Sequence, residues 1–171
     1  MTELTLYLIR HAQAAERGPD YPDDGQRPLV DKGHHQAERS AVAFERLGIR
    51  FDRIFSSPLE RAAQTAKALR HLVSGRVEHL ESLAEQDYAQ LLEDLGEQLR
   101  PGDETIACVG HEPYLSELAS TLLTGKWGSL DTRFRKAAVM ILSGVTSPGR
   151  MRLEGFLTSG VIRRLMARGG P

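Results

Sequence analysis

Arginine and histidine side chains follow apolar segments at three places in the chain. Arg10 and His11 follow the first apolar run, and His111 follows a later one. Arg61 stands in the first turn of a predicted helix, shortly after a third run. The planar guanidinium group of arginine suits phosphate oxygens, and a neutral imidazole nitrogen can attack phosphorus and hold the phosphoryl group covalently. Together these residue types indicate phosphoryl transfer through a histidine.

The apolar runs before these residues are short and apolar on both alternating faces, which predicts strands that are covered on both sides. We expect strands at 4–9, 52–57, 77–83, 104–110, 137–143 and 150–157. Helical patterns, with apolar residues three and four positions apart, alternate with the strands. We expect helices at 32–47, 58–73, 87–99, 113–124 and 159–168.

Strand and helix segments alternate along a chain of 171 residues, a length that suits one domain with a sizeable core. We therefore predict a single domain over residues 1–171, with an α/β sandwich built on a mostly parallel sheet. Segment 14–33 is the one long irregular stretch. Such loops inside compact domains are usually functional or disordered.

The predicted sheet places the candidate residues at one edge. In open α/β sheets, ligands bind outside the carboxyl ends of the strands, and Arg10, His11 and His111 follow such ends. Arg61 should point toward them, because side chains on a helix lean toward its N-terminus. Four such groups repel one another unless an anion lies among them, so we expect an anion pocket. The sequence predicts a capping box of Ser57 and Glu60 at the start of the helix that carries Arg61, with Pro58 at the first helical position.

The stretches LIRHA (8–12), SSPLERAAQTA (56–66) and VGHEP (109–113) stand in this order and span most of the chain. They resemble the signature of the histidine phosphatase superfamily, the phosphoglycerate-mutase-like clan, although many relatives have RHG where this chain has RHA. The resemblance implies a three-layer sandwich, phosphoglycerate mutase-like, with helices on both faces of a mostly parallel sheet. It also implies that His11 is the phosphorylated nucleophile and that the reaction needs no metal or other cofactor. The phosphate pocket would be lined by Arg10, Arg61 and His111.

Within the superfamily, the chain most resembles the small bacterial phosphohistidine phosphatases. It is short, and RPLVDKG (27–33) resembles a stretch of that subfamily. Region 85–104 has room for one helix but not for an inserted lid, and an open site suits a phosphorylated side chain of another protein. The resemblance thus implies a signalling phosphatase for phosphohistidine proteins. The alternatives are a phosphatase for small phosphoesters and a non-catalytic phosphate-binding signalling module.

A carboxylic acid is expected to protonate the leaving group. Mutase-type relatives supply a glutamate soon after the third strand, in a pattern that this chain does not reproduce. We favour Glu85, in the turn just past that strand, over Glu81 and Asp87, and an absent acid is a further alternative. Arg27 either contacts the substrate phosphate or braces its loop, and both interpretations stay open.

The composition excludes several other classes of protein. With 22 basic and 23 acidic residues, the net charge is −1, which argues against nucleic acid as the main partner. The lone Cys108 rules out an internal disulfide. No apolar run approaches the roughly 18 residues of a membrane helix, and the N-terminus lacks the basic start of a signal peptide, so we expect a cytoplasmic protein without a membrane partner. Three basic residues precede the expected strand 137–143: Arg133, Arg135 and Lys136. We interpret them as a solvent-exposed face rather than as a basic surface that binds a protein substrate.

Overall fold

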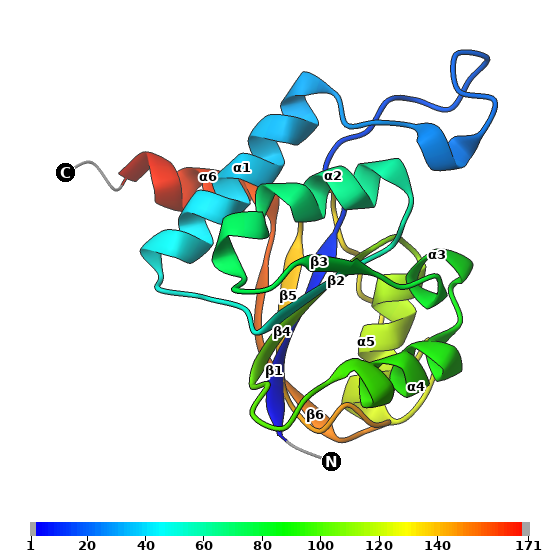
Figure 1. Ribbon diagram of the computed structural model, residues 1–171, viewed down its shortest axis with the longest axis vertical. Helices are drawn as coiled ribbons and strands as arrows, with labels where there is room; N and C mark the ends of the chain where they lie inside the picture. The colour runs from blue at the N-terminus through cyan, green and yellow to red at the C-terminus, as the bar shows by residue number, and fades with distance from the viewer. Residues whose placement is uncertain (1–2, 169–171) are drawn as a thin grey trace.

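The computed structural model describes residues 3–168, in which helices cover both faces of a six-stranded sheet (Figure 1). The predicted domain 1–171 also includes residues 1–2 and 169–171, which lie outside the described part. The order of the strands in the sheet is β3-β2-β4-β1-β5-β6. Their bounds are β1 Leu4–Arg10, β2 Arg53–Ser56, β3 Val77–His79, β4 Thr105–Gly110, β5 Val139–Gly144 and β6 Met151–Leu157.

The sheet is mostly parallel, as the sequence predicts. Strand β1 pairs in parallel with β4, and β2 pairs in parallel with both β4 and β3. The last two strands reverse direction, because β5 runs antiparallel to β1 and β6 runs antiparallel to β5. The start of β5 therefore lies at the same edge of the sheet as the end of β1, where the candidate residues stand.

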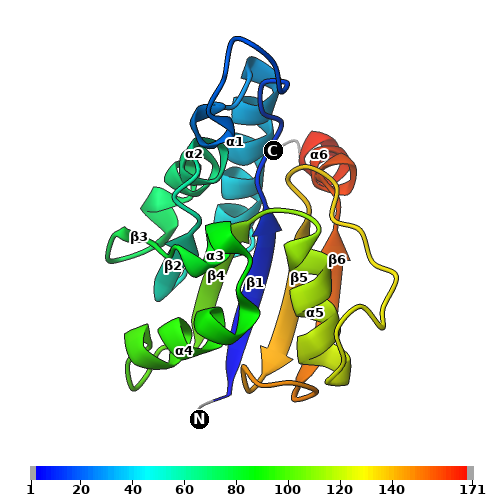
Figure 2. The same ribbon diagram turned by 90° about the vertical axis from the view of Figure 1, so that its right-hand side faces the viewer.

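The helices form two layers, and this confirms the three-layer architecture (Figure 1, Figure 2). One face carries α1, α2 and α6, and the opposite face carries α3, α4 and α5. Two short 3-10 helices, η1 and η2, follow the first strand and α2. The bounds are η1 Asp24–Gln26, α1 Asp31–Arg46, α2 Glu60–Ala68, η2 Arg70–Leu72, α3 Ser82–Glu85, α4 Tyr88–Gln98, α5 Tyr114–Thr124 and α6 Ser159–Arg168.

Strand β1 divides the core between the two layers, because successive side chains of a strand point to opposite faces. Leu6 and Leu8 pack in the cluster that includes α4 and α5. Tyr7 and Ile9 pack in the other cluster, with residues of α1 and α2. Both faces of the strand are buried, which explains its continuous apolar sequence.

The elements differ from the predicted ones mainly at β3 and α2. The predicted strand 77–83 ends at His79, and the residues that follow form α3. A short alternating segment does not distinguish a strand from a buried helical turn. Here Leu83 belongs to α3 and its side chain is buried. The predicted helix 58–73 is shorter, with η2 as a separate turn. In the described range 3–168, no helix is long and apolar enough to cross a membrane.

Candidate active site

Two adjacent parallel strands bring the two histidines together. Strands β1 and β4 are in register, with Arg10 opposite Gly110. The next residues, His11 and His111, therefore lie side by side, and their ring centroids are 5.1 Å apart. The backbone N–H of His11 donates to the carbonyl of Gly110 at 3.0 Å, which extends the pairing past the strand end.

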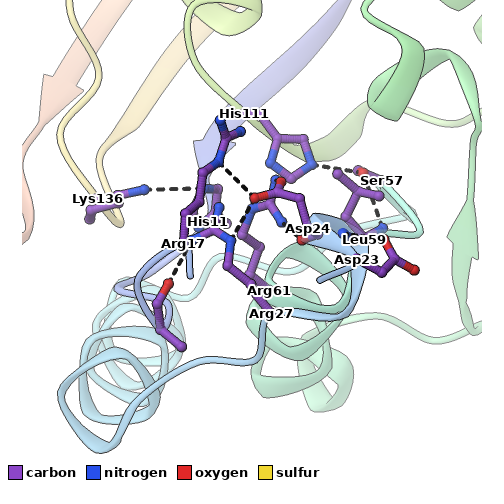
Figure 3. A network of polar contacts seen from close by, with 12 residues as sticks. His11, Arg17, Asp23, Asp24, Arg27, Ser57, Leu59, Arg61, His111 and Lys136 are labelled. Carbon is purple, nitrogen blue, oxygen red and sulfur yellow. Dashed lines mark hydrogen bonds and ion pairs between the residues drawn. The ribbon is translucent and has the colours of Figure 1, made fainter. Parts of the chain in front are cut away.

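Arg61 reaches the same edge from α2. Its side chain is buried, with 5% of the residue exposed, and points toward the histidines (Figure 3). Nη1 donates to the carbonyl of Asp24 at 2.7 Å, and Nη2 donates to the Asp24 carboxylate at 3.0 Å. The direction is the one expected from the backward lean of helix side chains.

The predicted capping box at the start of α2 is wrong. The helix begins at Glu60 with Leu59 as its N-cap, and no side chain caps it. The Ser57 hydroxyl lies 2.8 Å from Nε2 of His111 and accepts the N–H of Leu59 at 3.3 Å. The Ser57 hydroxyl, which the local pattern assigns to the cap of α2, thus contacts His111 in the site instead.

His11 is a neutral imidazole with one unprotonated ring nitrogen. Its Nδ1 lies 2.8 Å from the carbonyl of Ala12, and a carbonyl only accepts, so Nδ1 carries the ring proton. Burial lowers the pKa of His11 to about 2, and the charge of Lys136 acts in the same direction. Nε2 therefore keeps its lone pair at neutral pH, as a nucleophile requires. The Nζ of Lys136 lies 3.3 Å from this atom.

His111 is neutral for the same reason. Burial, followed by the charge of Arg61, lowers its pKa to about 3. Its Nε2 contacts Ser57, while Nδ1 is buried without a hydrogen-bond partner. The ring therefore offers a polar atom to a ligand without adding a positive charge.

A carboxylate already lies among the arginines. Asp24, in η1, contacts three of them: Arg17 Nε at 2.7 Å, Arg27 Nε at 2.7 Å and Arg61 Nη2 at 3.0 Å (Figure 3). The hydrogen bonds from Arg27 and Arg17 hold the pKa of Asp24 at about 2, so the group is ionised. The negative charge beside Arg61 is therefore supplied by the chain itself, and the binding of a phosphate anion here stays a prediction.

Arg10 and Arg27 are both fixed by main-chain carbonyls. Arg10 Nη1 donates to Phe134 at 2.6 Å, and Arg27 Nη1 donates to Ala15 at 2.6 Å. With its bond to Asp24, Arg27 makes the contacts expected of a residue that braces the loop. Its contact with a substrate phosphate stays a prediction.

The site contains buried polar atoms without hydrogen-bond partners. Among the described residues, such atoms include Arg10 Nε, Arg61 Nε and His111 Nδ1. Buried polar groups are normally hydrogen-bonded, and an unpaired one costs about 1–3 kcal/mol. A ligand with several acceptor oxygens would satisfy groups of this kind.

Two backbone contacts hold the loop after the nucleophile. The N–H of Ala12 donates to Thr65 Oγ1 in α2 at 3.0 Å. The carbonyl of Gln13 accepts the N–H of Val30 at 3.1 Å, just before α1. Gly33 permits this approach, because a Cβ there would lie 2.0 Å from the Gln13 carbonyl oxygen. The glycine of the RPLVDKG stretch therefore has a packing reason.

The predicted acid, Glu85, is not brought into this cluster. It is exposed at the end of α3, and within residues 3–168 its side chain has no hydrogen bond or ion pair. Glu81 and Asp87 are also exposed, and Asp87 caps α4. The role of Glu85 as the acid stays a prediction.

Sequence reasoning missed Asp24, Ser57 and Lys136. Asp24 lies in the irregular loop, and its only signal was its place shortly before Arg27. The sequence indicates a solvated face for Lys136, but this residue is half-buried against His11. In the described part of the chain, no group of three or more His, Cys, Asp or Glu side chains is arranged to hold a metal ion.

Known proteins share the sequence pattern and the fold. The family model of the histidine phosphatase superfamily (branch 1) matches residues 6–102. An uncharacterised protein of Picosynechococcus sp. is 35% identical over 127 residues, which cover 73% of this chain and 76% of that protein. The protein histidine phosphatase SixA, complexed with tungstate, superposes with a TM-score of 0.74 at 20% identity, covering 92% of this chain and 98% of that one. Phosphoserine phosphatase from Entamoeba histolytica superposes with a TM-score of 0.66 at 20% identity, covering 93% and 99%.

Proposed function

The chain belongs to the histidine phosphatase superfamily, and from this premise we propose that it is a phosphatase that works through a phosphohistidine at His11. Arg10, Arg61 and His111 bind the phosphoryl oxygens in this proposal. The observation that carries it is the state of His11: a buried, neutral ring whose Nδ1 is tied to a carbonyl, so that Nε2 alone faces the cationic pocket.

The reaction has two displacements. In the first, Nε2 of His11 attacks phosphorus, and the bond from phosphorus to the leaving group breaks. In the second, water attacks the phosphohistidine, and the electron pair of the P–N bond returns to Nε2. The arginines stabilise the charge on the equatorial oxygens in both steps, which is the main electrostatic tool in phosphoryl transfer.

We propose a phosphohistidine of another protein as the substrate. Between β3 and β4 the chain has only α3 and α4, so no inserted lid stands over the strand ends. A groove of about 570 Å³, with Arg10 and Arg133 in its lining, opens beside the site. It gives room for a substrate larger than a phosphate ion. His11 itself is only 3% exposed, so the open site expected from the sequence is not seen at the nucleophile.

Small phosphoesters are the second candidate substrates. The buried nucleophile favours them, because a compact phosphoester reaches a covered histidine more easily than a side chain of a folded protein. The phosphoserine phosphatase of the same fold is consistent with this candidate.

The test is covalent trapping during turnover, with a ³²P-phosphohistidine protein, phosphoserine and p-nitrophenyl phosphate as substrates and EDTA present. We expect acid-labile, base-stable phosphate on His11, and a higher kcat/KM for the phosphohistidine protein than for phosphoserine. His11→Ala should lose both label and hydrolysis, whereas the exposed His34 can be changed to Ala as a matched control. Substantial activity in His11→Ala would remove this residue from the role, and the reverse substrate order would favour small phosphoesters.

A further inference from the structure

Lys136 stands directly in front of the nucleophile. Its Nζ lies 3.3 Å from Nε2 of His11 (Figure 3). Nδ1 of His11 carries the ring proton, so Nε2 accepts in this contact and Nζ donates. The ammonium group therefore touches the atom at which the phosphoryl group is received in the proposed function.

The backbone around Lys136 is held against the end of β1. Arg10 Nη1 binds the carbonyl of Phe134 at 2.6 Å, and the N–H of Ala137 donates to the carbonyl of His11 at 3.2 Å. Ala137 has a φ of 56°, in the left-handed region. This conformation is unfavourable for a residue with a Cβ and persists where the surroundings enforce it. The position of Lys136 is thus imposed by the nucleophile's own loop.

Within residues 3–168, no carboxyl group contacts the His11 imidazole. Asp24 is ionised and bound by arginines, and its pKa is about 2. The carboxylate of Glu112 accepts hydrogen bonds from two neighbouring residues. Glu85 is exposed and has no contact with the cluster. His111 is neutral at physiological pH. The ammonium group of Lys136, which contacts His11, can donate a proton.

We propose that Lys136 is the general acid of the first displacement and the general base of the second. This inference rests on the proposed function, because it assigns a role within the same site. The four-carbon side chain of lysine is flexible and can swing aside when the phosphoryl group takes the place in front of Nε2.

Protons and electrons balance over the two steps. As Nε2 attacks, the electron pair of the breaking P–O or P–N bond moves to the leaving atom, and Nζ gives that atom its proton. Lys136 is then a neutral amine. When water attacks phosphorus, its proton passes to Nζ, and the pair of the P–Nε2 bond returns to His11. The ammonium and the free imidazole are restored, with inorganic phosphate as product.

The surroundings of Lys136 suit this exchange. Burial lowers its pKa to about 8, and neighbouring positive charges act in the same direction. A proton donor works best when its pKa lies near the working pH. The carboxylate that opposes the shift is Asp24 in η1, and the cations are Arg10 from β1, Arg27 from the loop and Arg61 from α2. Activity should therefore fall as the pH rises through about 8, because Nζ loses its proton.

The experiment compares Lys136→Met and Lys136→Arg with the wild type on glycerol phosphate and p-nitrophenyl phosphate. The alkoxide of glycerol needs a proton to leave, whereas nitrophenolate does not. Both variants should lose roughly 10²–10⁴-fold in kcat/KM on glycerol phosphate and much less on p-nitrophenyl phosphate. Arginine keeps the charge but holds its proton, so it should not rescue. With p-nitrophenyl phosphate, whose first step stays fast, the phosphohistidine should accumulate in Lys136→Met, because the second step lacks its base. The alkaline limb of the pH profile should disappear.

Arg135→Met is the matched control, since Arg135 is exposed and adjacent in sequence, and it should retain wild-type kinetics. Rescue by Lys136→Arg, or equal losses on both substrates, would overturn the proton-transfer role. A leaving-group-dependent loss in Glu85→Gln would return that role to Glu85. Failure to find phosphate on His11 of the wild type is a different result: it would refute the proposed function itself, and the role of Lys136 with it.

Discussion

Replacing Asp24 by Asn tests whether this carboxylate occupies the place of the substrate's phosphoryl group. The carboxylate binds Arg61, a donor proposed to bind phosphate, and is shared with Arg17 and Arg27. A phosphoryl group that takes these donors must displace it. Removal of the negative charge should therefore tighten the binding of a phosphate analogue such as vanadate, rather than weaken it.

The size of the effect follows from how exposed the pair is. Hydrogen bonds to charged groups contribute about 1.5–3 kcal/mol when buried, whereas exposed ion pairs contribute about 0–1 kcal/mol. The Arg61 side chain is 6% exposed and the Asp24 side chain is 37% exposed, so the pair lies between these limits. We take about 1 kcal/mol as the contribution of the Asp24–Arg61 pair, so its removal should lower the Kd of vanadate roughly fivefold.

The assay is calorimetric titration of vanadate into the wild type, Asp24→Asn and Asp23→Asn at one pH and low salt. Asp23 is the control for net charge, because its carboxylate accepts hydrogen bonds within η1, from Gly25 and Gln26. We expect tighter binding in Asp24→Asn and a smaller change in Asp23→Asn. Weaker binding in Asp24→Asn would refute the competition and mean that the carboxylate holds the arginines in place for the ligand.

Three further predictions concern other parts of the site. Arg61→Ala should reduce transition-state stabilisation by about 2–4 kcal/mol in kcat/KM, and Arg61→Lys should recover little; full rescue by lysine would mean that net charge is enough. In the folded protein the pKa of His111 is lowered from 6.5 to about 3. Between these two pH values the unfolded chain binds more protons than the folded one, so the free energy of unfolding falls as the pH drops from 6.5 to 3. His111→Gln should remove up to about 1.4 kcal/mol per pH unit from that slope in urea unfolding, and an unchanged slope would contradict a neutral His111. Gly33→Ala should lower the urea midpoint, because its Cβ meets the Gln13 carbonyl, whereas Gly96→Ala, inside α4 where a Cβ meets open space, should not lower it.

Much of the fold is predictable from local sequence. Apolar runs of two-sided character mark the central strands, and periodic apolar stripes mark the helices between them. The order of these elements implies a mostly parallel sheet, and the carboxyl ends of parallel strands share an edge. For this reason Arg10, His11 and His111 could be placed together before any contact was known. Family membership, which the motifs indicate, is confirmed by the match over residues 6–102.

Local patterns failed where a tertiary contact competes with them. Ser57 has the sequence of a helix cap, but its hydroxyl contacts His111, and α2 starts later without a side-chain cap. The alternation after residue 77 suggests a longer strand, but burial of Leu83 is achieved by a helical turn. For Ser57 the competing contact lies far away in the sequence, so no window of neighbouring residues contains it.

By itself, the sequence determined most of the elements, the parallel part of the sheet and the residues that end its strands. Only the tertiary structure decided that Asp24 enters the pocket and that Lys136 faces Nε2 of His11. Asp24 lies in a loop without periodicity, where hydrogen bonds from three arginines set its position. Lys136 precedes β5, and because β5 runs antiparallel to β1, the residues before its first position meet the residues after the end of β1. The rule that ligands bind at the carboxyl ends of parallel strands therefore does not find Lys136, which precedes an antiparallel strand.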